Sequence, residues 1–236
     1  MTNPTTLHNG GGSRLYTWVA ITMIVIVFAG FAYTYYLKEL FGTPALPGLL
    51  HLHGLVMTLW FALFLVQVSL IAAGRVDLHR RVGVVGALLA ALVVVVGVTT
   101  AITAARLGHT PGPPPLVFLT IPLGDMLVFP ALIGAGLFFR HRSEFHKRFM
   151  LLSSLSLLTA AIARIPLSFI SAGGLPLFFG LTDLCIVSCV AYDTVKNHRL
   201  HPAFGWGMLV IIASQALRFM LAGTSEWAQF AAWLVG

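Results

Sequence analysis

Charged residues are scarce in this sequence. Asp, Glu, Lys and Arg together make up 9% of its 236 residues, whereas 58% of the residues are hydrophobic. An ordinary soluble domain has about 25% charged residues. A water-soluble fold of this size is therefore excluded, whereas a bilayer accepts long apolar runs that form helices and so satisfy their own backbone hydrogen bonds. The composition predicts an all-α, multi-pass membrane protein.

The sequence also has few cysteines and lacks the short motifs of several enzyme classes. The two cysteines, Cys185 and Cys189, lie in one apolar run, which excludes a disulfide framework and a CxxC metal site. The sequence contains neither HExxH nor GxSxG, which are motifs of zinc proteases and of many serine hydrolases. The net charge of +7 includes no basic run longer than three residues, so we expect no nucleic-acid partner.

Apolar runs of about 20 residues, the length that crosses a bilayer as a helix, are abundant. Seven such runs cover residues 16–37, 48–74, 82–105, 116–139, 150–171, 175–195 and 202–222. Residues 1–15 are expected to form a short N-terminal tail, with no cleavage site that would make it a removable signal. Residues 223–236 are too short to cross again, and Trp227 and Trp233 suit them to lie at the membrane interface. The sequence thus predicts a seven-helix transmembrane domain over residues 16–222.

The connecting segments predict the orientation, because Lys and Arg accumulate on the cytoplasmic side. The segments GRVDLHRR, RHRSEFHKR and VKNHRLH, together with Arg14, hold ten of the fourteen basic residues. We therefore expect a cytoplasmic N-terminus. The lipid bilayer is the expected partner, with a second copy or a membrane complex as a further one.

The same three segments contain a short repeated pattern. They read DLHRRVG, EFHKRFM and RLHPAFG, with His79, His146 and His201 near the start of a returning helix. The runs on either side would form three hairpins, made of the second and third, fourth and fifth, and sixth and seventh helices. Hairpins repeated in one direction are typical of parallel-repeat transporters.

Four charged residues lie well inside the predicted spans: Asp125, Arg164, Asp183 and Arg218. At about 1.5 Å per helical residue, all four lie roughly 6 to 13 Å below the outer end of their helices. A charge inside the membrane costs about 2.5–3.5 kcal/mol, so we expect the acids and bases to pair. The predicted pairs are Asp125 with Arg164 and Asp183 with Arg218, each within one hairpin, either as structural clamps or as the lining of a polar site.

Other residues at this level favour a polar site open to the outer face. Pro122 and Pro130 flank Asp125, Pro166 follows Arg164, and Gln215 lies within one turn of Arg218. Proline removes backbone donors, and a broken helix at membrane depth is typical of a binding site. His51 and His53 lie near the outer end of the second helix, on different faces.

Three chemical interpretations follow from these residues. In the first, a b-type heme takes neutral imidazole ligands from among His53, His79, His146 and His201, with arginines near its propionates. In the second, the protein is a small-solute or proton-coupled transporter, in which buried aspartates exchange protons. In the third, an intramembrane enzyme holds a metal ion with His51 or His53 and the buried aspartates.

The segments HLHGLVMTLWFALFLVQ, GRVDLHRRVG and EFHKRFMLLSSLSLL add a resemblance to these interpretations. They are similar to His-centred signatures of uncharacterised bacterial multi-pass membrane families, which are distantly like b-type cytochromes and oxidase-assembly membrane proteins. The resemblance implies that His53, His79 and His146 are the positions to suspect of a functional role, and it also implies a bacterial inner-membrane location. We therefore expect a heme-associated or redox-linked membrane protein, with the transporter as the alternative.

Overall fold

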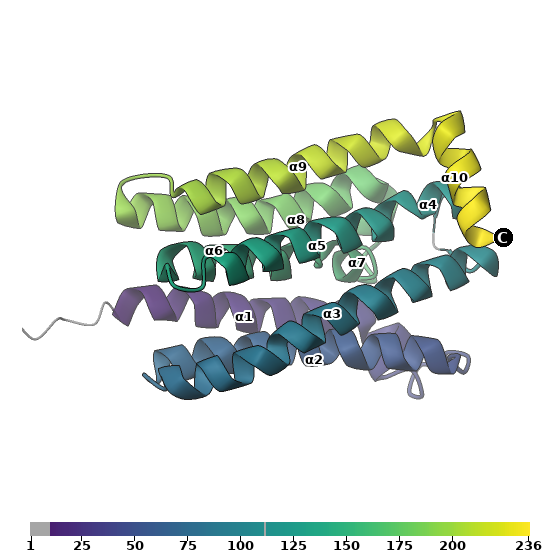
Figure 1. Cartoon of the computed structure of the whole chain (residues 1–236). Coiled ribbons are helices and arrows are strands. Elements are labelled where there is room, and N and C mark those ends of the chain that lie inside the picture. The colour runs from purple at the N-terminus through teal and green to yellow at the C-terminus, as the bar shows by residue number, and fades with distance from the viewer. Residues whose placement is uncertain (1–9, 111) are drawn as a thin grey trace, which may run out of the picture.

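The computed structural model describes residues 10–110 and 112–236, and these residues form an all-helical bundle without a strand (Figure 1). The long helices run roughly along one direction, and six of the helical segments are long and apolar enough to cross a membrane. The elements are α1 (Gly10–Phe31), η1 (Ala32–Tyr36), α2 (Gly48–Ala72), α3 (Val76–Arg106), α4 (Pro115–Phe118), α5 (Thr120–Phe138), α6 (Ser143–Ser156), α7 (Thr159–Ile162), α8 (Ser168–Asn197), α9 (Pro202–Ala222) and α10 (Ser225–Val235). The prediction of an all-α protein is therefore confirmed, and the six apolar helices are compatible with the predicted multi-pass membrane protein.

The fifth expected span, residues 150–171, is not one continuous helix. Its first half is α6, which begins seven residues earlier, at Ser143, and the short α7 follows after a turn. The chain then leaves the helical conformation before Pro166, which has no N–H to donate and disfavours a helical residue in front of it. Residues 168–171 belong to α8, because the helix restarts directly after the break.

Two further departures from regular helix lie in the same half of the bundle. The C-terminal end of the first predicted span forms η1, a π-helix directly after α1. Gly174 interrupts α8 with φ of 58° and ψ of −158°, a conformation that glycine adopts without steric cost. The break expected around Asp125 does not lie there, because Pro122, Asp125 and Pro130 are all within α5. The interruption between α4 and α5 is at Leu119, three residues before Pro122.

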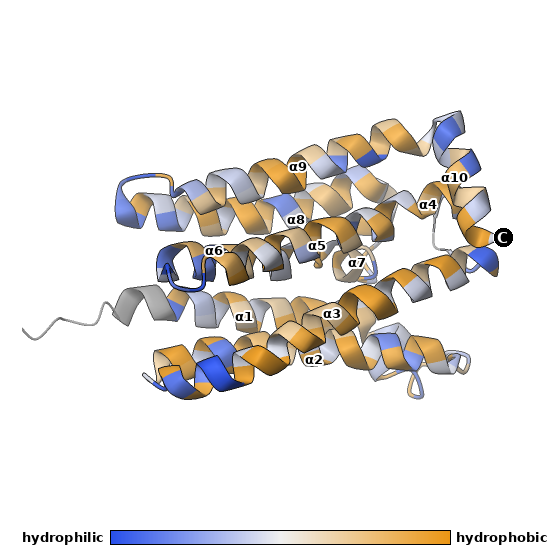
Figure 2. Cartoon of the chain, viewed as in Figure 1, coloured by the Kyte–Doolittle hydropathy of each residue, from blue (hydrophilic) through white to orange (hydrophobic). Residues whose placement is uncertain are grey.

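The hairpins α2–α3, α5–α6 and α8–α9 all turn at the same end of the bundle, on the left in Figure 1. Their turns contain the basic segments that the sequence assigns to one membrane side. Figure 2 shows hydrophobic residues along the middle of the helices and hydrophilic residues mainly toward the ends. Large apolar side chains such as Leu88 and Leu127 are 69% and 73% exposed, which is expected where the outer surface contacts lipid chains.

The C-terminal helix α10 lies across the opposite end of the bundle (Figure 1). The indole Nε1 of Trp227 donates to the carbonyl oxygen of Leu116 at 2.8 Å, and Nε of Arg106 donates to that of Val235 at 2.6 Å. These bonds attach α10 to α4 and to the end of α3. Trp233 is 76% exposed, and the expected interfacial position of this helix stays a prediction.

Candidate functional site

An ion pair between α5 and α9 lies in the polar layer that the sequence predicts for the outer half of the membrane. Nη1 of Arg218 donates to a carboxylate oxygen of Asp125 at 2.6 Å and to the carbonyl oxygen of Ile121 at 3.2 Å. Nε of the same arginine donates to Oγ of Ser214 at 3.2 Å. Gly124 makes room for this side chain, because a methyl group there would overlap the guanidinium. Both charged side chains are largely buried, so the pair satisfies two charges inside the bundle.

The predicted pairing within each hairpin is wrong. Asp125 pairs with Arg218 of another hairpin and not with Arg164, because α5 packs directly against α9. Asp183 instead accepts a hydrogen bond of 2.9 Å from Nε2 of Gln215. The layer expected from the sequence therefore exists in part, with Gln215 as the neutral partner of one acid.

Arg164 lies in the break between α7 and α8. Its Nη1 donates to the carbonyl oxygen of Ala160 at 2.8 Å, and its guanidinium lies 5.1 Å from the centre of the Phe31 ring. Among the residues that the structure describes, no carboxylate forms an ion pair with Arg164. The arginine is thus held by a backbone oxygen and an aromatic face.

The two histidines near the start of α2 have different surroundings. His51 is exposed and lies beside Tyr35, whose hydroxyl donates to the carbonyl oxygen of His51 at 3.1 Å. His53 has a buried Nδ1 without a hydrogen-bond partner. Neither is brought together with Asp125 and Asp183, and residues 10–110 and 112–236 contain no group of three or more His, Cys, Asp or Glu suited to a metal ion.

The histidines of two repeated segments meet at the other end of the bundle. The rings of His79 and His146 lie 6.1 Å apart, centre to centre, with an angle of 81° between their planes. Nδ1 of His146 lies 2.8 Å from the carbonyl oxygen of Gly136. With its amide nitrogen turned toward His79, Gln67 donates to Nδ1 of that ring, while its oxygen accepts from the backbone N–H of Gly83 at 2.9 Å. The structure thus brings two of the four expected heme ligands together.

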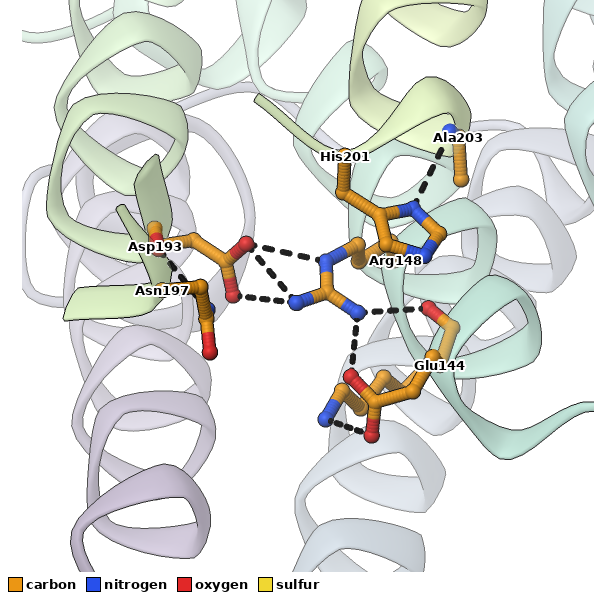
Figure 3. Close-up of polar contacts among 7 residues, drawn as sticks. Glu144, Arg148, Asp193, Asn197, His201 and Ala203 are labelled. Atoms are coloured by element: carbon orange, nitrogen blue, oxygen red, sulfur yellow. Dashed lines mark hydrogen bonds and ion pairs between the residues drawn. The ribbon is translucent and has the colours of Figure 1, made fainter. Parts of the chain in front are cut away.

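The third repeated histidine, His201, is separate from this pair. It is the N-cap of α9, where its Nδ1 accepts from the backbone N–H of Ala203 at 3.2 Å (Figure 3). Its ring packs on Phe145, with ring centres 4.6 Å apart. Partial burial and, after it, the positive charge of Arg148 lower the pKa of His201. A neutral Nδ1 is required for the cap, so the geometry favours the unprotonated ring.

Sequence reasoning missed a buried charge cluster near this end, drawn in Figure 3. Arg148 of α6 is 1% exposed. Its Nε and Nη2 donate to both carboxylate oxygens of Asp193 on α8 at 2.7 to 3.0 Å, and its Nη1 donates to the side chain of Glu144 at 2.6 Å. The guanidinium of Arg148 also lies 5.5 Å from the centre of the Phe204 ring on α9.

By their number and position in the sequence, the basic residues of this end predict only the orientation of the chain. Two signals in the sequence favour a different interpretation of Arg148. Glu144 precedes it by four residues, the spacing of an intrahelical ion pair, and Asp193 is the one acidic residue near the end of the sixth predicted span. A bidentate arginine–carboxylate pair of this kind connects α6 to α8.

Comparisons with known proteins add no relative to this description: no protein-family profile, no curated protein and no solved structure matches the chain.

Proposed function

We propose that this chain is an integral membrane protein of the bacterial inner membrane with seven crossings and a cytoplasmic N-terminus. The six long apolar helices support most of these crossings. The segment α6–α7 would supply the remaining one as a broken crossing, since it connects the α5–α6 turn at one end with the start of α8 toward the other (Figure 1). The three hairpins that turn at the basic end favour the proposed threefold repeat.

We further propose that the protein is redox-linked and binds heme b at its cytoplasmic end. The observation that carries this proposal is the pair of imidazoles from two hairpins, His79 and His146, whose rings lie edge to face with centres 6.1 Å apart. Histidines on different helices are common axial ligands of heme iron. Heme bound there would supply one-electron transfer.

The surroundings of His146 fit a ligand role. If Nδ1 donates its hydrogen to the carbonyl oxygen of Gly136, the lone pair is on Nε2. Metal-binding histidines usually have such a partner, which fixes the orientation and the tautomer of the ring. The protein therefore holds His146 with its Nε2 available.

The surroundings of His79 fit the role of a heme ligand after a change of its tautomer. Its Nδ1 accepts from Gln67, so the hydrogen of the neutral ring is on Nε2. Iron binding through Nε2 would require the opposite tautomer, with the Gln67 oxygen turned toward Nδ1. Gln67 is accordingly the residue that controls which nitrogen of His79 is free.

The test is the heme content of the purified protein and of single variants. We expect His79→Ala and His146→Ala each to lower the heme-to-protein ratio severalfold. His141→Ala is the matched control, because His141 is an exposed histidine in the α5–α6 turn at the same end. Equal heme content in all four proteins would contradict the proposal.

A second candidate function, transport of a proton or a small cation, is favoured by Asp183. This carboxyl is half-buried in the outer half of the bundle, and its hydrogen-bond partner is the neutral amide of Gln215. A carboxylate without a cation at this depth is suited to bind one. The test is ion or proton flux in proteoliposomes, where Asp183→Asn would abolish a flux that Glu226→Gln, an exposed change at the same end, leaves intact.

A further inference from the structure

The charges of the outer layer do not cancel pair by pair. Asp125 and Arg218 neutralise one another at 2.6 Å, and Gln215 takes the place of a cation beside Asp183. Arg164 is left as a positive charge with no paired carboxylate within residues 10–110 and 112–236. An uncompensated arginine inside a membrane is energetically unfavourable, so a compensating group is expected from outside the chain.

Arg164 lies in a segment of the backbone that is not helical. The break between α7 and α8 removes the residue from a regular helix, and Pro166 prevents the helix from continuing through it. The guanidinium has one of its faces toward Phe31 and gives one hydrogen bond to a backbone oxygen. A guanidinium has five N–H donors, so most of its donors remain available for a ligand.

A second polar group without a partner lies on α2, and η1 contacts the surroundings of both residues. The Arg164 guanidinium lies 5.1 Å from the ring of Phe31, the residue before η1, and Gly54, next to His53, lies against the ring of Tyr35 in η1. His53 has a buried Nδ1 that neither donates nor accepts a hydrogen bond, and such an atom carries a desolvation cost. A ligand that accepts hydrogen bonds from both residues would remove this cost as well.

The helix that carries His53 is fixed against η1. The hydroxyl groups of Tyr36 and Thr58 are 2.8 Å apart, and a methyl group on Gly54 would overlap the ring of Tyr35. Single π-helical turns are frequent at functional sites. The π-helix and the broken helix thus position His53 and Arg164 from two separate parts of the chain.

The chemistry of these two residues selects the ligand. An arginine edge binds an oxyanion such as carboxylate or phosphate with two parallel hydrogen bonds, and a neutral imidazole donates one more. Leu167 and Phe169, which follow the break, are 47% and 61% exposed and offer an apolar surface beside it. We propose that Arg164 and His53 bind the oxyanion headgroup of an amphiphile from the outer leaflet, whose acyl chain lies along this surface.

This proposal is independent of the heme proposal, because the two sites share no residue. Its test is thermal unfolding of the purified protein in a neutral detergent, followed during titration with phosphatidylglycerol, oleate, inorganic phosphate or phosphatidylcholine. Arg164→Gln removes the charge and keeps a polar side chain. Arg106→Gln is the control, because Arg106 lies at the same end of the bundle but bonds the carbonyl oxygen of Val235.

We expect phosphatidylglycerol, oleate or both to raise the melting temperature of the unchanged protein and of Arg106→Gln, whereas phosphatidylcholine does not. Arg164→Gln should need roughly tenfold more of the anionic amphiphile for the same shift, the loss of about 1.4 kcal/mol of binding free energy. An equal response to phosphate alone would support the oxyanion site and assign it a soluble ligand. The proposal is overturned if no anion raises the melting temperature, or if Arg164→Gln responds as the unchanged protein does.

Where Arg164→Gln does not yield folded protein, His53→Phe serves as the second variant. It keeps an aromatic ring on α2 and removes the hydrogen-bonding nitrogens. It should weaken the response to the same anion by severalfold, and an unchanged response would overturn the proposed role of His53. Heme content, measured on the same samples, should be the same in all of these variants.

Discussion

Arg218 of α9 donates to Asp125 of α5 at 2.6 Å and thereby joins two hairpins. Within the hairpin α8–α9, the carboxylate of Asp183 instead accepts a hydrogen bond from the side-chain amide of Gln215. The polar layer of the outer half is therefore built across hairpins as well as within one of them. Changes in this layer should affect the packing of α5 against α9 before they affect either hairpin alone.

Arg218→Met should lower the free energy of unfolding by about 3–5 kcal/mol, because it leaves the Asp125 carboxyl buried without its cation. Adding Asp125→Leu should restore part of the loss, since both charges are then gone. Thermal unfolding in detergent measures both effects. Arg164→Met combined with Asp125→Leu should give additive losses, because these residues do not touch; recovery in that pair instead would support pairing within the hairpin.

The cluster around Arg148 leads to a second prediction. Asp193→Asn should lower the melting temperature strongly, because a guanidinium that is 1% exposed loses its main countercharge. Asp77→Asn removes an exposed carboxylate at the same end and should have little effect. Similar losses in the two variants would mean that the Arg148–Asp193 pair does not hold α6 to α8.

A close approach of two backbones leads to a third prediction. A methyl group on Gly30 would overlap the carbonyl group of Ala161, so α1 contacts α7 without intervening side chains. Gly30→Ala should destabilise the protein by about 1–3 kcal/mol. Gly134→Ala is the control, because nothing lies within 4 Å of the added carbon and alanine favours helix by about 0.5–1 kcal/mol. Equal effects of both substitutions in thermal unfolding would contradict this contact.

The pKa of His201 predicts a dependence of stability on pH. Because the folded state lowers this pKa, the unfolded chain binds the proton more readily, with a pKa near 6.5. The stabilisation is therefore complete above about pH 6.5 and is lost as the pH falls below it. His201→Asn keeps a capping oxygen but does not titrate, so its melting temperature should fall less between pH 7 and pH 5.5. Parallel curves would assign the pH dependence to other groups.

The helical architecture could be predicted because composition and run length determine which segments suit a bilayer. The second, third and seventh runs match α2, α3 and α9 within a few residues, apart from the start of α3, which begins six residues before the predicted run. The break in the fifth run could not be located from apolarity alone. Pro166 disfavours a continuous helix, but apolarity does not indicate that the helix restarts at Ser168 as part of α8.

The charged residues of the polar layer could be identified from the sequence, but their pairing could not. Intramembrane charges are rare, so Asp125 and Arg218 stand out in any hydropathy profile. Their partners depend on which helices pack together, and this is not encoded in local spacing. Arg148 was missed because it lies at the edge of a span, where a basic residue is the ordinary orientation signal.

The most direct measurement of the redox proposal is the absorption spectrum of the purified protein in detergent, before and after reduction with dithionite. The proposal predicts a Soret band that shifts on reduction and that is lost in the double variant His79→Ala/His146→Ala. The double variant of exposed histidines, His51→Ala/His141→Ala, should keep the band. A band that persists without His79 and His146, or a colourless protein from cells supplied with heme, would contradict the proposal.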